Sequence, residues 1–182
     1  MTSPGSVGGG ERARLFVALR LPLETLELLV PWQQRELRGR VVVPGNLHVT
    51  LAFLGSRPVG DVDPVARALA EAARTAERPV LAVRGYRETR SVGMLDLHDL
   101  GGHAAALAED VHTRLERLGV YRRESRPWLA HLTVLRFRER PRLRPALPDP
   151  GRFSPSEAAV YHSVLRPGGA QYEVLESVAL GG

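Results

Sequence analysis

"NLHVTLAFLG" (Asn46–Gly55) and "AHLTVLRF" (Ala130–Phe137) carry the same pattern: a histidine, an apolar residue, a threonine and then an apolar run. The two histidines lie close to half the chain length apart. An ancient duplication is the economical interpretation, and it predicts two similar halves. The other residues of the halves show little identity, so the interpretation depends on this repeated pattern.

Both stretches are typical of β-strands, in which successive side chains point to opposite faces. His48 and Thr50 therefore share one face of the first strand, and His131 and Thr133 share one face of the second. The opposite face of each strand is apolar and suits packing under helices. If a pseudo-twofold axis relates the halves, the two polar pairs can converge on one cleft.

Hydrophobic periodicity and turn residues predict the remaining elements. A buried strand is expected over 13–21, followed by a helical pattern over 23–39 that Pro31 should kink or divide into two short pieces. Strands and helices alternate without strict β-α-β order, which favours an α+β fold. The further helices expected lie over 63–78 and 101–119, and the further strands over 79–88 and 91–100. A Pro-rich loop is expected over 138–156. It is followed, over 158–180, by two strands joined by a Pro-Gly-Gly turn.

Composition limits the class of protein. A chain of 182 residues suits one compact domain or two closely packed lobes, expected over 11–182, with the Gly-rich residues 1–10 as a disordered tail. It contains no cysteine, which excludes disulfides, thiolate metal sites and cysteine nucleophiles. No signal peptide or membrane-spanning run is recognisable, so we expect a cytoplasmic protein with no membrane partner.

All 25 basic residues are arginine, and the net charge is +5. The planar guanidinium group suits phosphate and carboxylate oxygens, so a nucleotide or nucleic-acid partner is compatible with this composition. A GC-rich genome that encodes arginine in place of lysine explains the same bias. Composition leaves the two interpretations open.

Two histidines that face each other have a defined chemical use. With ordinary pKa values of about 6.5, one ring can donate a proton while the other accepts one near neutral pH. Neighbouring hydroxyl groups can donate hydrogen bonds to phosphate oxygens, so in-line attack on a phosphodiester needs no metal or other cofactor. A single His-x-Thr is a weak signal, whereas two copies in matching apolar contexts indicate a functional pair.

The segments "RLFVAL", "PGNLHVTLAFLG", "RPWLAHLTVLRF" and "SVLRPGGAQYEVL" resemble, in order and spacing, those of the 2H phosphoesterases. The closest resemblance is to the RNA 2′,3′-cyclic phosphodiesterases, also called 2′-5′ RNA ligases. It covers nearly the whole chain, from about Arg14 to Leu180. It implies a bilobal, pseudo-twofold α+β fold, with two mainly antiparallel sheets and outer helices around a central cleft.

The resemblance also implies roles for individual residues. His48 matches the general acid that protonates the departing ribose oxygen, and His131 matches the general base that activates water. Thr50 and Thr133 match hydroxyl groups that contact the phosphate, and Arg136 matches a basic residue that reaches it. Strict strand alternation puts Arg136 on the face opposite His131, so a bulge or the strand end must turn it inward.

Aromatic candidates for stacking on a substrate base are fewer. Many related proteins carry a tryptophan in the central strand, which is absent from "RETRSVGMLDL", so Phe16 is the best remaining candidate. Tyr172 is a second candidate for contact with substrate, and closing the rim of the cleft is the alternative interpretation of it. A buried core position is the competing interpretation of Phe16. His103 and His112 share one expected helix without the spacing of a zinc pair, and we interpret both as solvated helix residues.

The sequence predicts a metal-independent enzyme that opens a ribose 2′,3′-cyclic phosphate, at the end of RNA or an oligonucleotide or in a small cyclic nucleotide, to a 2′-phosphomonoester. Reverse joining through a 2′-5′ link is a plausible side activity. One alternative is a module that binds a nucleotide or RNA-end phosphate without turnover. Another is a metallohydrolase with both histidines as ligands, which the lack of an accompanying carboxylate disfavours.

Overall fold

Two four-stranded antiparallel sheets dominate the computed structural model, which describes residues 10–181. The strand order is β3-β1-β7-β8 in the first sheet and β2-β6-β5-β4 in the second. The two His-x-Thr motifs thus lie in different sheets, on β3 and β6. The strands are β1 Arg12–Arg20, β2 Arg40–Val41, β3 His48–Pro58, β4 Val80–Glu88, β5 Val92–Leu100, β6 His131–Arg136, β7 Glu157–Arg166 and β8 Gly169–Ala179.

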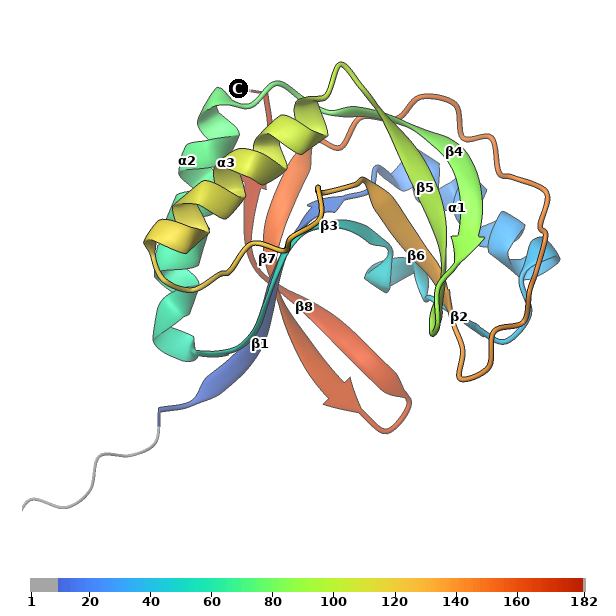
Figure 1. Ribbon diagram of the computed structural model, residues 1–182, viewed down its shortest axis with the longest axis horizontal. Coiled ribbons are helices and arrows are strands. Elements are labelled where there is room, and N and C mark those ends of the chain that lie inside the picture. The colour runs from blue at the N-terminus through green and yellow to red at the C-terminus, as the bar shows by residue number, and fades with distance from the viewer. Residues whose placement is uncertain (1–9, 182) are drawn as a thin grey trace, which may run out of the picture.

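Helices cover the outer sides of both sheets (Figure 1). Helices α2 (Val62–Thr75) and α3 (His103–Arg117) lie on the first sheet, and α1 (Leu23–Glu36) lies on the second. The side chain of Gln33 in α1 donates a hydrogen bond to the carbonyl of Val134 in β6, at 3.1 Å. The expected α+β fold with outer helices is therefore confirmed.

A single hydrophobic cluster includes buried residues from both sheets. Val17 and Val49 belong to the first sheet, and Leu95 and Leu132 belong to the second. Because the two sheets share this core, their relative placement is fixed by apolar burial rather than by a linker. This supports treating 11–182 as one bilobal domain, although that boundary stays a prediction.

The expected division of this helix into two short pieces at Pro31 is wrong, because α1 runs unbroken from Leu23 to Glu36. The alternative expectation, a kink at Pro31, stays a prediction. Proline removes one backbone hydrogen bond inside a helix. Here Leu29, Trp32 and Gln33 are buried, and the Trp32 indole donates a hydrogen bond to the Ala146 carbonyl at 2.6 Å. These contacts hold the turns around the proline against the second sheet.

The expected tail of residues 1–10 lies outside the described residues, apart from Gly10. Within residues 10–181, none of the helices combines the length and the hydrophobicity that crossing a bilayer requires.

Candidate active site

The first motif orients its histidine by two hydrogen bonds. The Nδ1 of His48 lies 2.8 Å from the Asn46 carbonyl oxygen, and Nε2 lies 3.0 Å from the Thr50 hydroxyl. A carbonyl oxygen only accepts, so Nδ1 carries the hydrogen. In the neutral ring, Nε2 then accepts from the Thr50 hydroxyl, and in the imidazolium form it donates to the same oxygen.

The second motif repeats the first of these two hydrogen bonds. The Nδ1 of His131 donates to the Leu129 carbonyl at 3.0 Å, again two residues before the histidine. Thr133 lies on the same strand and is only partly exposed, as His131 is. A backbone carbonyl thus fixes the tautomer of each ring and leaves Nε2 available for proton transfer.

The electrostatic environment of His48 includes groups from the second motif strand. The pKa of His48 is lowered to about 4, first by burial and also by the positive charges of Arg136 and His131, against the opposing effect of the Asn46 hydrogen bond. The groups act on each other across the two sheets. A hollow of about 550 Å³ lies beside them and is lined by both Thr50 and His131. Each motif thus contributes one residue to the wall of this hollow, and the convergence of all four side chains on one substrate stays a prediction.

A bulge in β6 brings Arg136 to this site. Thr133 pairs with Met94 and Leu135 pairs with Gly93, so Val134 is an extra residue without a partner in β5. Val134 and Leu135 are both buried, and the alternation of faces shifts by one position after them. Arg136 consequently shares the face of Thr133, and its guanidinium donates to the Tyr172 hydroxyl at 3.3 Å.

A matching bulge in β3 exposes a residue that sequence reasoning missed. Thr50 pairs with Ala18 and Ala52 pairs with Val17, so Leu51 has no partner in β1. The alternation shifts here too, and Phe53 turns toward the hollow, with 50% of its surface exposed. Two residues separate Thr50 from Phe53, just as two separate Thr133 from Arg136, and this spacing is the signal that could have identified Phe53.

The two aromatic candidates differ in position. Phe16 is 3% exposed and packs beneath His48, with 4.8 Å between the ring centroids, so its assignment as a stacking surface for substrate is wrong. Its burial against Tyr161 leaves no ring face for a base. Tyr172 is partly exposed, and its ring meets His48 edge to face at 5.3 Å between centroids. It remains a candidate for contact with substrate.

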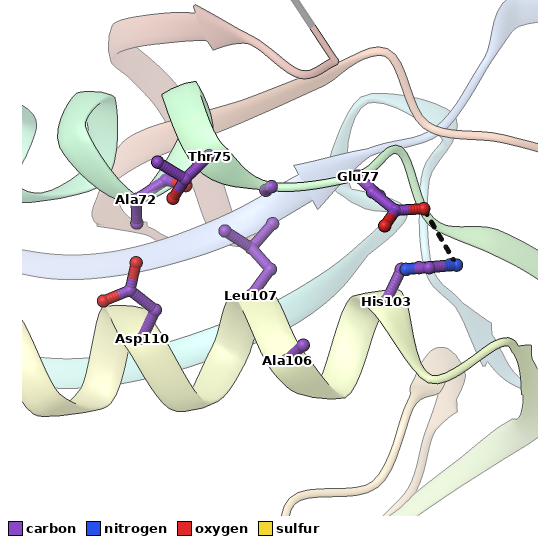
Figure 2. A pocket seen from close by; sticks show the side chains of 8 residues that line it. Ala72, Thr75, Glu77, His103, Ala106, Leu107 and Asp110 are labelled. Carbon is purple, nitrogen blue, oxygen red and sulfur yellow. Dashed lines mark hydrogen bonds and ion pairs between the residues drawn. The ribbon is translucent and has the colours of Figure 1, made fainter.

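The interpretation of His112 as a solvated residue is also wrong. Its side chain is 5% exposed, and its Nε2 donates to the Leu51 carbonyl at 2.7 Å. The sequence around His112 is amphipathic, but periodicity alone does not reveal that a helix histidine faces a strand bulge. His103 lies instead at a smaller hollow between α2 and α3, opposite Glu77 (Figure 2), and its Nε2 is 3.5 Å from a carboxylate oxygen of Glu77.

The residues of 10–181 include no group of three or more histidine, aspartate or glutamate side chains placed to hold a metal ion. The two motif histidines bring no carboxylate ligand with them. The two motifs themselves contribute two imidazoles and two hydroxyls, and Arg136 adds a guanidinium. The walls of the adjacent hollow also carry charged side chains, among them those of Arg87, Arg122, Arg123, Arg126 and Glu109.

Stability should fall on acidification because of His48. The unfolded chain binds a proton at this residue below pH 6.5 and the folded chain only below about 4, so the free energy of unfolding decreases as the pH falls between those values. The pKa difference corresponds to about 3 kcal/mol. Urea unfolding at pH 7 and pH 4.5 measures it. In His48→Gln the decrease should be smaller than in the parent chain, and an equal decrease in both would contradict the prediction.

Comparison with known proteins agrees with this geometry. Residues 23–90 match the family of LigT-like phosphoesterases. The chain is 32% identical to the RNA 2′,3′-cyclic phosphodiesterase of Thermus thermophilus, covering 93% of this chain and 91% of that protein. It is 27% identical to the protein of the same name from Escherichia coli K12, covering 93% and 98%.

Solved structures show the same likeness. Apo LigT of Escherichia coli superposes with a TM-score of 0.78 at 26% identity, covering 95% of this chain and all of that one. LigT in complex with 3′-AMP superposes with a TM-score of 0.76 at 25% identity, with the same coverage. With two sheets that each carry a His-x-Thr motif, and with relatives alike over almost their whole length, the chain belongs to the LigT-like family of 2H phosphoesterases.

Proposed function

We propose that this protein hydrolyses the 2′,3′-cyclic phosphate at the end of RNA or of an oligonucleotide and leaves a 2′-phosphomonoester. The observation that carries the proposal is the pair of motif imidazoles, each with Nδ1 bound to a backbone carbonyl, with His131 and Arg136 close enough to His48 to lower its pKa. The relatives named RNA 2′,3′-cyclic phosphodiesterase and the LigT complex with 3′-AMP support it.

In the proposed reaction, Nε2 of His131 takes a proton from water, and the water oxygen attacks phosphorus in line with the ribose 3′ oxygen. The new P–O bond forms as the bond to the 3′ oxygen breaks. His48 gives its proton to that oxygen, which leaves as a 3′ hydroxyl. Thr50, Thr133 and Arg136 donate hydrogen bonds to the non-bridging oxygens, where negative charge gathers.

The donor role of His48 requires a change in its pKa on binding. A pKa of about 4 leaves this ring neutral at pH 7. An anionic phosphate between the rings attracts the imidazolium and offsets the repulsion from Arg136 and His131, so binding raises the pKa. The proton is then acquired with the substrate. The exposed ring of Phe53 at the adjacent hollow offers a surface on which a nucleobase can stack.

The direct test is turnover of a 2′,3′-cyclic mononucleotide and of a short RNA with a cyclic phosphate end, followed by ³¹P NMR. We expect a 2′-phosphomonoester from the RNA, at a rate that a chelator leaves unchanged. Binding of both substrates without turnover would favour the non-catalytic module. Loss of turnover with chelator, restored by a divalent cation, would favour the metallohydrolase.

Two further parts of the proposal follow from the substrate. The same site catalyses the reverse reaction in principle, so a 2′-5′ joining activity is expected as a minor one. The proposed location is the cytoplasm, where RNA ends of this kind are available to the enzyme.

A further inference from the structure

We infer that Trp128 and His112 are positioning residues that hold the bulge of β3 and, through it, the hydroxyl of Thr50 against His48. The inference rests on the proposed function for its kinetic consequences. The hydrogen bonds that support it are independent of that function.

The bulge leaves two successive backbone carbonyls to be satisfied by side chains. β3 is an edge strand, so only β1 pairs with it. The indole Nε1 of Trp128 donates to the Thr50 carbonyl at 3.0 Å, and Nε2 of His112 donates to the Leu51 carbonyl at 2.7 Å. A bulged residue lacks the regular hydrogen bonds between paired strands. A buried carbonyl that accepts no hydrogen bond lowers the stability of the fold. The two side chains replace a strand partner at the point where alternation shifts.

The two donors come from different parts of the fold. His112 lies on α3, and its ring stacks on Tyr121 with 4.8 Å between centroids, which fixes the direction of its N–H. Trp128 precedes the second motif, and the next residue, Leu129, supplies the carbonyl that orients His131. The segment from Trp128 to His131 therefore contacts the backbone of the first motif and sets the tautomer of the second. This segment therefore connects the two His-x-Thr motifs directly.

Loss of either hydrogen bond should change the positions of the catalytic groups more than it changes the affinity for substrate. If Thr50 shifts, its hydroxyl leaves the 3.0 Å contact with Nε2 of His48, and the first motif moves relative to His131. Proton transfer depends steeply on such distances, whereas a phosphate held by Arg136 tolerates a small displacement. Loss of either donor should therefore reduce kcat more than it changes KM.

The positioning role is tested by substitutions that keep an aromatic ring at these positions and remove the N–H donor. In Trp128→Phe we expect kcat to fall about tenfold or more with KM changed less than about threefold. His112→Phe should behave alike, while His112→Gln, which keeps an N–H donor, should retain more of the parent kcat. The double variant Trp128→Phe with His112→Phe should lose less than the product of the two single losses, because both donors hold one bulge.

Trp32→Phe is the matched control, because Trp32 is the other tryptophan of the chain and donates a comparable hydrogen bond to Ala146 on the outer side of the second sheet. It should lower the melting temperature while kcat stays at the parent value. An unchanged kcat in Trp128→Phe, or an equal loss in Trp32→Phe, would overturn the inference.

A second readout separates this inference from the proposed function. Imidazole ¹⁵N NMR of His48 reports on its ring directly, and the signals and pKa should change in Trp128→Phe and stay constant in Trp32→Phe. If the parent chain turns over no cyclic phosphate, the proposed function fails and this measurement still decides the positioning role. Unchanged His48 signals in Trp128→Phe would refute that role whatever the activity.

Discussion

Replacement of either His48 or His131 by glutamine should lower kcat for cyclic phosphate hydrolysis by about 10² to 10⁴, the range expected for loss of a general acid or base. Glutamine fills a similar volume and can form hydrogen bonds, but it does not titrate near neutral pH. The phosphate contacts of Thr50, Thr133 and Arg136 remain, so KM should change little. Steady-state kinetics on a short RNA with a cyclic phosphate end measures both constants.

The control for these variants is His103→Gln, because His103 lies at the hollow between α2 and α3 (Figure 2). This substitution should leave kcat unchanged. The double variant His48→Gln with His131→Gln should be little worse than the single variants, because the two rings take part in one proton exchange. A single variant that keeps the parent kcat would show that its imidazole does not transfer a proton.

Replacement of Arg136 by glutamine should lower kcat/KM by about 10², because a charged donor to the developing phosphate charge is lost. The same change should raise the pKa of His48 toward its ordinary value, since the Arg136 charge is one of the causes that lower it. Kinetics on the RNA substrate and an NMR titration of His48 measure the two effects. We expect kcat/KM to fall while the pKa of His48 rises.

Arg136→Lys keeps the charge but loses the planar pair of donors, so it should restore the low pKa of His48 and only part of the activity. Arg74→Gln is a suitable control, because Arg74 is exposed near the end of α2 on the outer side of the first sheet. A pKa of His48 that is the same in Arg136→Gln as in the parent would place the guanidinium too far away to act in the site.

Local sequence was sufficient for the strands that carry the motifs, for the helices other than the expected division at Pro31, and for the pairing of functional residues within each motif. The period of two puts His48 with Thr50 and His131 with Thr133, because a single strand determines which side chains share its face. Gly119, where a helix was predicted to end, lies two residues after the last residue of α3 and has a φ of +71°, a conformation that favours glycine. The repeated pattern and the family resemblance then extended this local knowledge to two facing halves.

Local sequence could not predict where the two-residue alternation of side chains along a strand is interrupted. Arg136 and Phe53 reach the cleft because a bulge shifts the alternation in each motif strand, and a bulge arises from how two strands pair. Phe16 obeys the alternation but is covered by Tyr161 and Tyr172, which come from the far end of the chain. His112 was misinterpreted for the same reason, since its partner is a strand carbonyl distant in sequence.

The sequence alone determined which residues can carry the chemistry, because residue type and strand parity are local properties. Tertiary structure decided which of them meet, how the tautomers are fixed, and how far the pKa of His48 falls. Those properties depend on burial and on charges brought from another sheet, and a chain acquires them only when its distant segments pack together.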